Sequence, residues 1–173
     1  MAATLRESIL EALRDLLATD DFFPAAAIDE PQPNPSGPGG WAAIAGTSPR
    51  LQHACAVQDG PPPDHLAFAR GAEDQDADEL ELEAMIAYVV SAAPDSGQLS
   101  ADCRAARRAR RDEAVRRIAA LVAANRTLGL SSEVYAEVRP AQRDDAVAFP
   151  NAEPGAVALV PVRVLYTAAS AAD

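Results

Sequence analysis

Residues 80–90 read LELEAMIAYVV, and in this stretch apolar side chains alternate with glutamates. The even-numbered positions from Leu80 to Val90 are all apolar, whereas Glu81 and Glu83 occupy odd-numbered positions. A period of two is typical of a β-strand with one buried face. The polar side disappears after Met85, so we expect the second half of this strand to be covered on both faces.

An amphipathic helix is predicted on each side of this strand. At the N-terminus, Leu5, Ile9, Leu13 and Leu16 recur at spacings of three and four residues, and the helix is expected to end near Asp20. A longer helix is predicted from about Ser100 to Arg126, with an apolar stripe near its C-terminal end. That stripe comprises Val115, Ile118, Ala119, Leu121 and Val122.

Two further strands are predicted in the C-terminal third of the chain. Residues 133–139 alternate, with Val134, Ala136 and Val138 on one side, and residues 156–167 alternate in the same way. Pro161 lies inside the last strand and lacks the N–H that a sheet ladder needs, which predicts an edge strand or a bulge there. Residues 140–154 are interpreted as a connection.

The segment 24–63 has a different composition. It holds nine of the 14 prolines and five of the nine glycines, a density that excludes helix and disfavours long strands. Short strands near 41–45 and 53–58 are compatible with the sequence, but we expect most of the segment to be a surface loop that partners order.

This order of elements predicts an α+β fold within one domain that spans residues 1–173. The expected architecture is a single mixed or antiparallel sheet with two helices packed on one face and a long Pro/Gly-rich loop insertion at 24–63. Of the apolar residues, 40 are Ala, and 42 larger side chains remain, which is enough for one modest core.

Composition also excludes several classes of function. The chain has 15 Arg and no Lys, so it can form neither a Walker phosphate loop nor a Schiff base. No Gly-x-Ser-x-Gly elbow occurs, and His53-x-Cys55 does not match common zinc spacing. The longest nearly apolar run, 84–93, is far shorter than a membrane span. We therefore expect a non-enzymatic protein without metal, cofactor or membrane partner.

Charge is the strongest remaining signal. The net charge is −11, yet seven of the 15 arginines lie within the 14 residues from Arg104 to Arg117. Three interpretations remain open: a solvated helix face, a contact with the acidic residues of a neighbouring identical subunit, and a nucleic-acid site. The third ranks last, because interleaved aromatic residues and a binding motif are missing from the sequence.

The whole pattern resembles the tail-terminator proteins of long-tailed bacteriophages and related gene-transfer particles, also called minor tail or tail-completion proteins. The resemblance covers about 1–17 and 79–167. It rests on the opening helix, the alternating strand 80–90, Leu128-Gly129-Leu130, and a Pro154-Gly155 turn that leads into a hydrophobic strand ending at Tyr166 and Thr167.

The resemblance implies an α/β subunit that forms a hexameric ring. Such a ring caps the finished tail tube, ends its polymerisation and offers the surface that joins the head or neck. The implied partners are the tail tube protein and a neck or head-completion protein, and DNA passes through the lumen without specific binding. The protein would be made in the host cytoplasm and reside in the virion, at the head-proximal end of the tail.

Two contact hypotheses follow for such a ring. Subunits would meet through four arginines and three glutamates, and the last strand would dock on a neighbour or on the tube by its free edge. The proposed subunit contact comprises Arg107, Arg108, Arg110 and Arg111 against Glu79, Glu81 and Glu83, and the proposed docking edge comprises Val162, Val164 and Tyr166. The alternative functions are a head-completion or neck connector protein, and a cytosolic adaptor that binds an acidic partner through the arginine helix.

Overall fold

The computed structural model describes residues 5–28, 41–60, 77–93, 100–147 and 155–169 of the chain. Of residues 77–80, 93, 100, 146–147 and 168–169, only the backbone is described. The element order is α1 (Leu5–Leu17), β1 (Ala26–Ile28), β2 (Ala42–Ile44), β3 (Arg50–Asp59), β4 (Ala77–Ala93), α2 (Ser100–Ala124), β5 (Tyr135–Val138), β6 (Gln142–Val147) and β7 (Gly155–Ala169).

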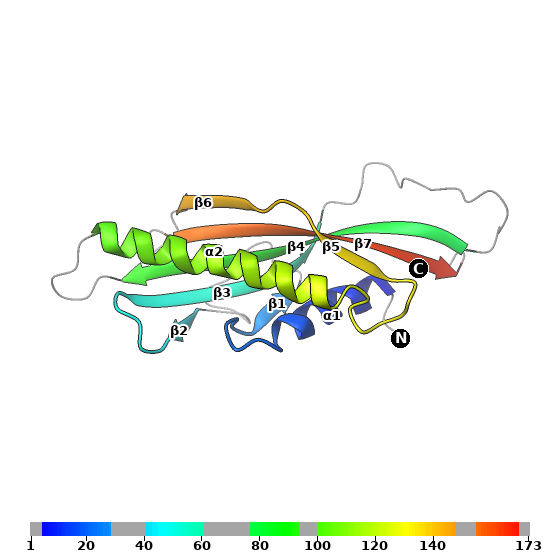
Figure 1. Cartoon of the computed structure of the whole chain (residues 1–173), viewed down its shortest axis with the longest axis horizontal. Coiled ribbons are helices and arrows are strands. Elements are labelled where there is room, and N and C mark those ends of the chain that lie inside the picture. The colour runs from blue at the N-terminus through cyan, green and yellow to red at the C-terminus, as the bar shows by residue number, and fades with distance from the viewer. Residues whose placement is uncertain (1–4, 29–40, 61–76, 94–99, 148–154, 170–173) are drawn as a thin grey trace.

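A single seven-stranded mixed sheet forms the base of the molecule (Figure 1). Its strand order is β1-β3-β4-β7-β5, with β2 also paired to β3 and β6 also paired to β7. Among the described strands only β1 runs parallel to its neighbour; the other pairings are antiparallel. The long strands β4 and β7 form the centre, and their pairing extends from Ala77↔Ala169 to Ser91↔Gly155.

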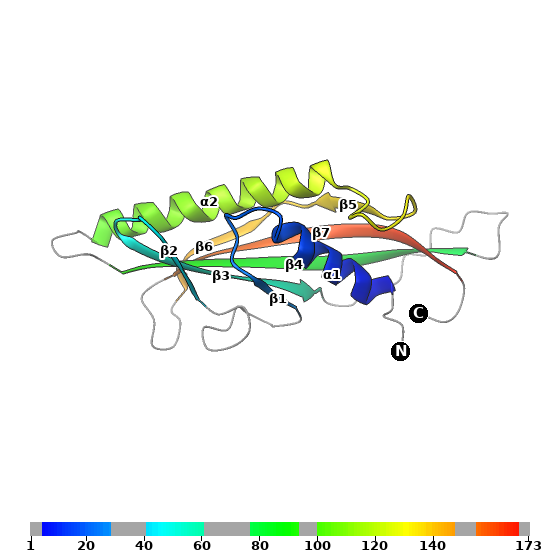
Figure 2. The same cartoon turned by 90° about the horizontal axis from the view of Figure 1, so that it is seen from below.

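Both helices contribute to one core on one face of this sheet. Figure 2 shows α2 lying along one side of the long central strands. The buried face of α1 (Ile9, Leu10, Leu13 and Leu17) belongs to the same hydrophobic cluster as Ile118 of α2 and the alternating apolar residues of the sheet. The α+β fold with one mixed sheet and two helices on one face, as predicted from the sequence, is confirmed.

The side chains of β4 alternate between the two faces of the sheet, as predicted. Leu82, Ile86 and Tyr88 face the common core, whereas Ala87 and Val89 face the opposite side of the sheet and are also buried. Glu81 and Glu83 lie on that opposite side nearer the start of the strand, as the period of two requires. Covering of the second half of β4 on both faces is thereby confirmed.

Within the segment 24–63, expected to be mainly a surface loop, residues 26–28, 42–44 and 50–59 form β1, β2 and β3, so the loop interpretation is wrong for these residues. The short strands considered near 41–45 and 53–58 are present as β2 and as part of the longer β3, which pairs with β4 over ten residues, from Arg50↔Ala93 to Asp59↔Ala84. Leu51, Cys55 and Val57 of β3 are buried in the core. The prolines of this segment do not interrupt β3, because Pro49 immediately precedes the strand. Residues 29–40 and 61–63 lie outside the described residues.

The edge-strand prediction for β7 is also wrong. The segment 140–154 contains β6, so β7 pairs with β4 on one side and with β6 and β5 in turn on the other. Val162 and Val164 are fully buried opposite Val138 and Ala136, and cannot act as a docking edge. Tyr166 pairs with Leu80 and is 6% exposed.

Pro161 is tolerated in this interior strand because of a gap between two short neighbours. β6 pairs with β7 as far as Leu159, and β5 pairs with it from Val162 onward. The carbonyl of Pro161 accepts a hydrogen bond from the N–H of Arg139 in the chain that links β5 to β6. Pro161 therefore faces the place where the neighbouring strand is interrupted, and its missing N–H removes no bond from either β5 or β6.

Candidate functional site

The arginines of α2 form three groups with different environments. Arg110 and Arg117 face the turn between α1 and β1, Arg108 and Arg111 face β6, and Arg104 and Arg116 are exposed. Arg107 is buried. Helical geometry explains the division, because residues three and four apart share a face, and α2 touches different neighbours along its length.

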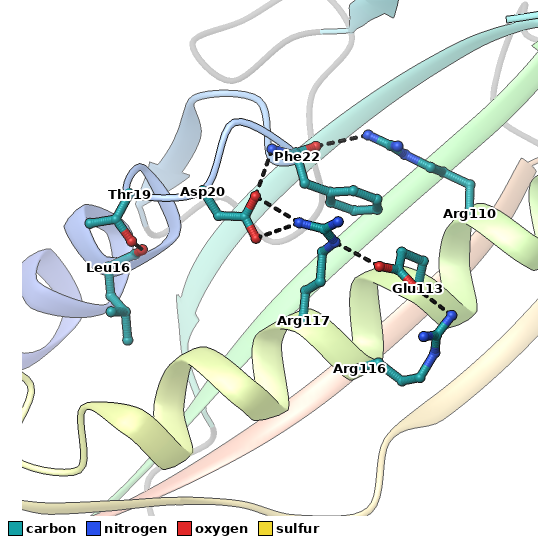
Figure 3. Close-up of polar contacts among 8 residues, drawn as sticks. All are labelled: Leu16, Thr19, Asp20, Phe22, Arg110, Glu113, Arg116 and Arg117. Atoms are coloured by element: carbon teal, nitrogen blue, oxygen red, sulfur yellow. Dashed lines mark hydrogen bonds and ion pairs between the residues drawn. The ribbon is translucent and has the colours of Figure 1, made fainter.

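The first group clamps the turn after α1 onto α2, as Figure 3 shows. Arg117 contacts both carboxylate oxygens of Asp20, at 3.0 and 2.9 Å, and also donates to Glu113 at 2.7 Å. Asp20 in turn accepts a hydrogen bond from the backbone N–H of Phe22. That backbone bond, together with Arg117, lowers the pKa of Asp20.

Arg110 binds the same turn from the other side. Its guanidinium lies 3.4 Å from the centre of the Phe22 ring and donates to the Phe22 carbonyl oxygen at 2.9 Å. It also donates through Nε to the Tyr88 hydroxyl at 3.3 Å. One side chain therefore joins α2, the α1–β1 turn and the central strand β4.

Tyr88 extends this hydrogen-bond network into the core. Its hydroxyl lies 3.0 Å from Nδ1 of His53 on β3, and because Arg110 already donates to the hydroxyl, the hydroxyl hydrogen is free to be donated to that nitrogen. Burial raises the pKa of Tyr88 to about 12. Burial, and secondarily the positive charge of Arg110, lowers the pKa of His53 to about 4. The buried imidazole is therefore neutral at pH 7.

We expect His53 to make stability depend on pH between 4 and 6.5. In this window the unfolded chain binds a proton at His53 and the folded chain does not, so the free energy of unfolding falls as the pH falls. The loss is expected to be about 2–3 kcal/mol between pH 7 and pH 4. Urea denaturation at a series of pH values measures it. The His53→Asn variant should lack this loss; an equally steep loss in the variant would contradict the assignment.

The second group holds β6. Arg108 and Arg111 share the carboxylate of Asp145, with 2.7 Å between Arg108 Nε and Asp145 Oδ2. Arg111 also pairs with Asp112 at 2.9 Å and is only 6% exposed. Arg143 of β6 lies 3.5 Å from the same Asp112. These contacts tie the outer strand β6 to the helix that covers the sheet.

Arg107 is as buried as Arg111, at 6% exposed, but it lacks the ion pairs of Arg111. Within the part of the chain that the structure describes, its Nε has no hydrogen-bond partner. Among the described residues no carboxylate pairs with its guanidinium. A buried cation without a counter-ion is costly, because the interior screens and solvates the charge poorly.

The opposite face of the sheet carries a smaller ion-pair network. Arg163 of β7 donates to Glu81 at 2.7 Å and lies 3.5 Å from Glu137 of β5, which also pairs with Arg139 at 3.3 Å. Glu83 lies on the same face and is exposed. No partner of its side chain is present in the part of the chain that the structure describes.

Three of the seven residues in the proposed subunit contact are at least partly buried and have partners within the same chain, and the subunit contact itself stays a prediction. Arg110, Arg111 and Glu81 are engaged with Phe22, Asp145 and Arg163 of the same chain. Arg107 lies on the buried face of α2, whereas Arg108 and Glu83 are exposed to solvent. The side chain of Glu79 lies outside the described residues. Sequence reasoning missed Asp20, Phe22 and Asp145 as partners, since no local pattern links them to α2.

The cysteines and histidines considered from the sequence as metal ligands are the remaining candidates. Cys55 and Cys103 are both free and buried, and burial raises the pKa of Cys55 to about 12. Within the described residues no three His, Cys, Asp or Glu side chains are grouped as metal ligands would be. None of the helices in that part of the chain is long and apolar enough to cross a membrane. His65 lies outside the described residues.

No family model matches the chain, and no curated protein matches it significantly.

Proposed function

We propose that this chain is a structural virion subunit of the tail-terminator kind. It forms a ring that caps the phage tail tube, ends tube polymerisation and provides the surface that joins the head or neck. The proposal starts from the resemblance of the helix, strand and closing-strand pattern to tail-terminator proteins. The observation that carries it is the subunit architecture, a single sheet with both helices on one face.

This architecture suits a ring subunit for a physical reason. With both helices on one face, the second face of the sheet carries the charged side chains Glu81, Glu83 and Arg163. A subunit whose two faces differ in this way can join its neighbours head to tail, through two different surfaces. Head-to-tail contacts close into a ring when the rotation between subunits divides a full turn.

The internal use of the arginines weighs against the adaptor alternative. Arg110 and Arg117 stabilise the turn after α1, and Arg111 holds β6, so these three arginines are paired within the chain and are not offered to an acidic partner. A neck connector would use a subunit of the same type, and its position in the particle distinguishes it from a tail terminator.

Electron cryo-microscopy of tail tubes incubated with the purified protein tests the proposal. We expect a six-fold ring of this chain at the head-proximal end of the tube and an arrest of further tube growth. Tubes incubated without the protein are the control. Bare tube ends together with rings bound to the head or portal would favour the neck connector, and bare ends without any ring would reject the proposal.

A further inference from the structure

The N-terminal half of α2 carries more positive charge than the described residues of the chain neutralise. Four arginines at spacings of three, four and seven residues lie along one side of the helix, and we call them the arginine stripe: Arg104, Arg107, Arg108 and Arg111. The ion pairs that described residues make to this stripe come from two carboxylates, Asp112 and Asp145. Both contact Arg111, and only Arg108 shares one of them.

The two remaining arginines, Arg104 and Arg107, differ in their exposure to solvent. Arg104 is exposed, and no ion pair to it is formed by the described residues. Arg107 is 94% removed from solvent and lacks a hydrogen bond at Nε. The exposed guanidinium can reach an external anion, while the buried one adds a positive field that water screens only weakly. An external carboxylate at Arg104 and Arg108 would therefore gain attraction from all three charges.

The chain also presents a carboxylate that has no described partner. Glu83 is exposed on the sheet face opposite α2, at the point where β3 ends its pairing with β4. The Gly60 N–H donates to the Glu83 backbone carbonyl at 2.8 Å, so the backbone of this residue is held in place while the side chain is free to make contacts. Its neighbour Glu81 is already paired with Arg163.

Within one chain these charges cannot meet, because the sheet separates them. α2 packs on the face that holds Leu82 and Ala84, and Glu83 points to the other face, as alternation along the strand dictates. A contact between the arginine stripe and Glu83 must therefore join two copies of the chain, and it joins different surfaces on each copy.

We propose that the arginine stripe binds the Glu83 carboxylate of a second copy of this chain, through Arg104 and Arg108 over the buried charge of Arg107. This contact rests on the proposed ring-forming function and specifies which surfaces of neighbouring subunits meet. It replaces the contact inferred from the sequence, because Arg110, Arg111 and Glu81 are paired within their own chain and at least partly buried. Arg108 shares Asp145 with Arg111 but remains exposed.

Disulfide capture between two variants tests the contact directly. Purified Glu83→Cys and Arg104→Cys chains are mixed at high concentration under mild oxidation, and covalent dimers are quantified on denaturing gels. We expect the mixture to give at least fivefold more dimer than either variant alone. Both native cysteines are buried and contribute little background. The matched control pairs Glu83→Cys with Arg116→Cys, which lies on the same helix outside the stripe.

Two outcomes of capture would overturn the contact: a mixture that gives no excess over the single variants, or equal excess with Arg104→Cys and Arg116→Cys. The result is independent of tail tubes. A chain that caps tubes but shows no capture rejects the contact and leaves the proposed function standing. A chain that shows capture but never caps a tube keeps the contact and rejects the function.

Replacing the buried Arg107 gives a second test, in which the Tm of the free subunit and the yield of captured dimer are expected to change in opposite directions. Arg107→Met keeps much of the apolar volume and removes a charge that no described carboxylate pairs with, so we expect the Tm of the free subunit to rise by about 2–4 °C. The same change should reduce the yield of captured dimer, because the field beneath the stripe is lost. A fall in Tm, or an unchanged yield of dimer, would show that Arg107 does not serve the contact.

Discussion

The Arg110→Met variant is expected to lose about 3 kcal/mol of unfolding free energy, measured by urea denaturation at pH 7. The change removes a charged hydrogen bond to the Phe22 carbonyl, a second one to the Tyr88 hydroxyl, and the packing of the guanidinium on the Phe22 ring. Hydrogen bonds from charged donors contribute about 1.5–3 kcal/mol, and a cation on an aromatic face about 0.5–2 kcal/mol. Met retains most of the aliphatic stem of Arg110, so the packing of that stem changes little.

Arg116→Met is the matched control for that experiment. Arg116 lies on the same helix, its side chain is 74% exposed, and it forms an ion pair with Glu113. We expect its stability to change by less than about 0.5 kcal/mol, since exposed pairs contribute little. Equal losses in the two variants would show that the contacts of Arg110 do not hold the turn after α1 to the sheet.

A second large effect is expected for Ile118→Ala, with a loss of about 3–4 kcal/mol. Ile118 is fully buried in the middle of the core that both helices share with the sheet. Truncation there removes buried methyl groups and leaves a cavity that the surrounding strands cannot fill completely. The free energy of unfolding from denaturant titration measures the loss.

Leu130→Ala removes a similar side chain from an exposed position. Leu130 is 39% exposed, so its truncation should lower stability by less than about 1 kcal/mol. If both truncations had the same small effect, α2 would not be packed on the sheet at Ile118 as described.

The long elements were predictable because each carries its own periodicity. α1, α2 and β4 all extend over ten residues or more, and their apolar spacing identifies both their type and their buried face. β3 was harder to recognise, since Cys55, Ala56 and Val57 form a continuous buried run within a segment dominated by proline and glycine. β6 has the sequence QRDDAV, in which no alternation predicts a strand; pairing with β7 determines its structure.

The arginine cluster shows how a strong composition signal can conceal a packing pattern. The buried stripe of α2 runs through Val122, Ile118 and Ala114, and the same spacing continued toward the N-terminus leads to Arg111, Arg107 and Cys103. Extending the stripe would have placed two arginines in the buried face. The partners of the others could not be found from sequence, because Asp20 is 97 residues from Arg117 and Asp145 is 34 residues from Arg111.

The position of β7 at the centre of the sheet has a consequence for how the protein is made. The ladder between β4 and β7 runs from Ala77↔Ala169 to Ser91↔Gly155, so it joins residues that are 64 to 92 positions apart in the sequence. Contacts of such long range form slowly, because a large loop must close before they are gained. While the ribosome is still adding residues 155–166, β4 has its whole β7 side uncovered, and the nascent chain is exposed to aggregation during that interval. Co-expression of a ribosome-associated chaperone, such as a trigger factor, should therefore raise the yield of soluble protein more than slower growth of the expression culture alone.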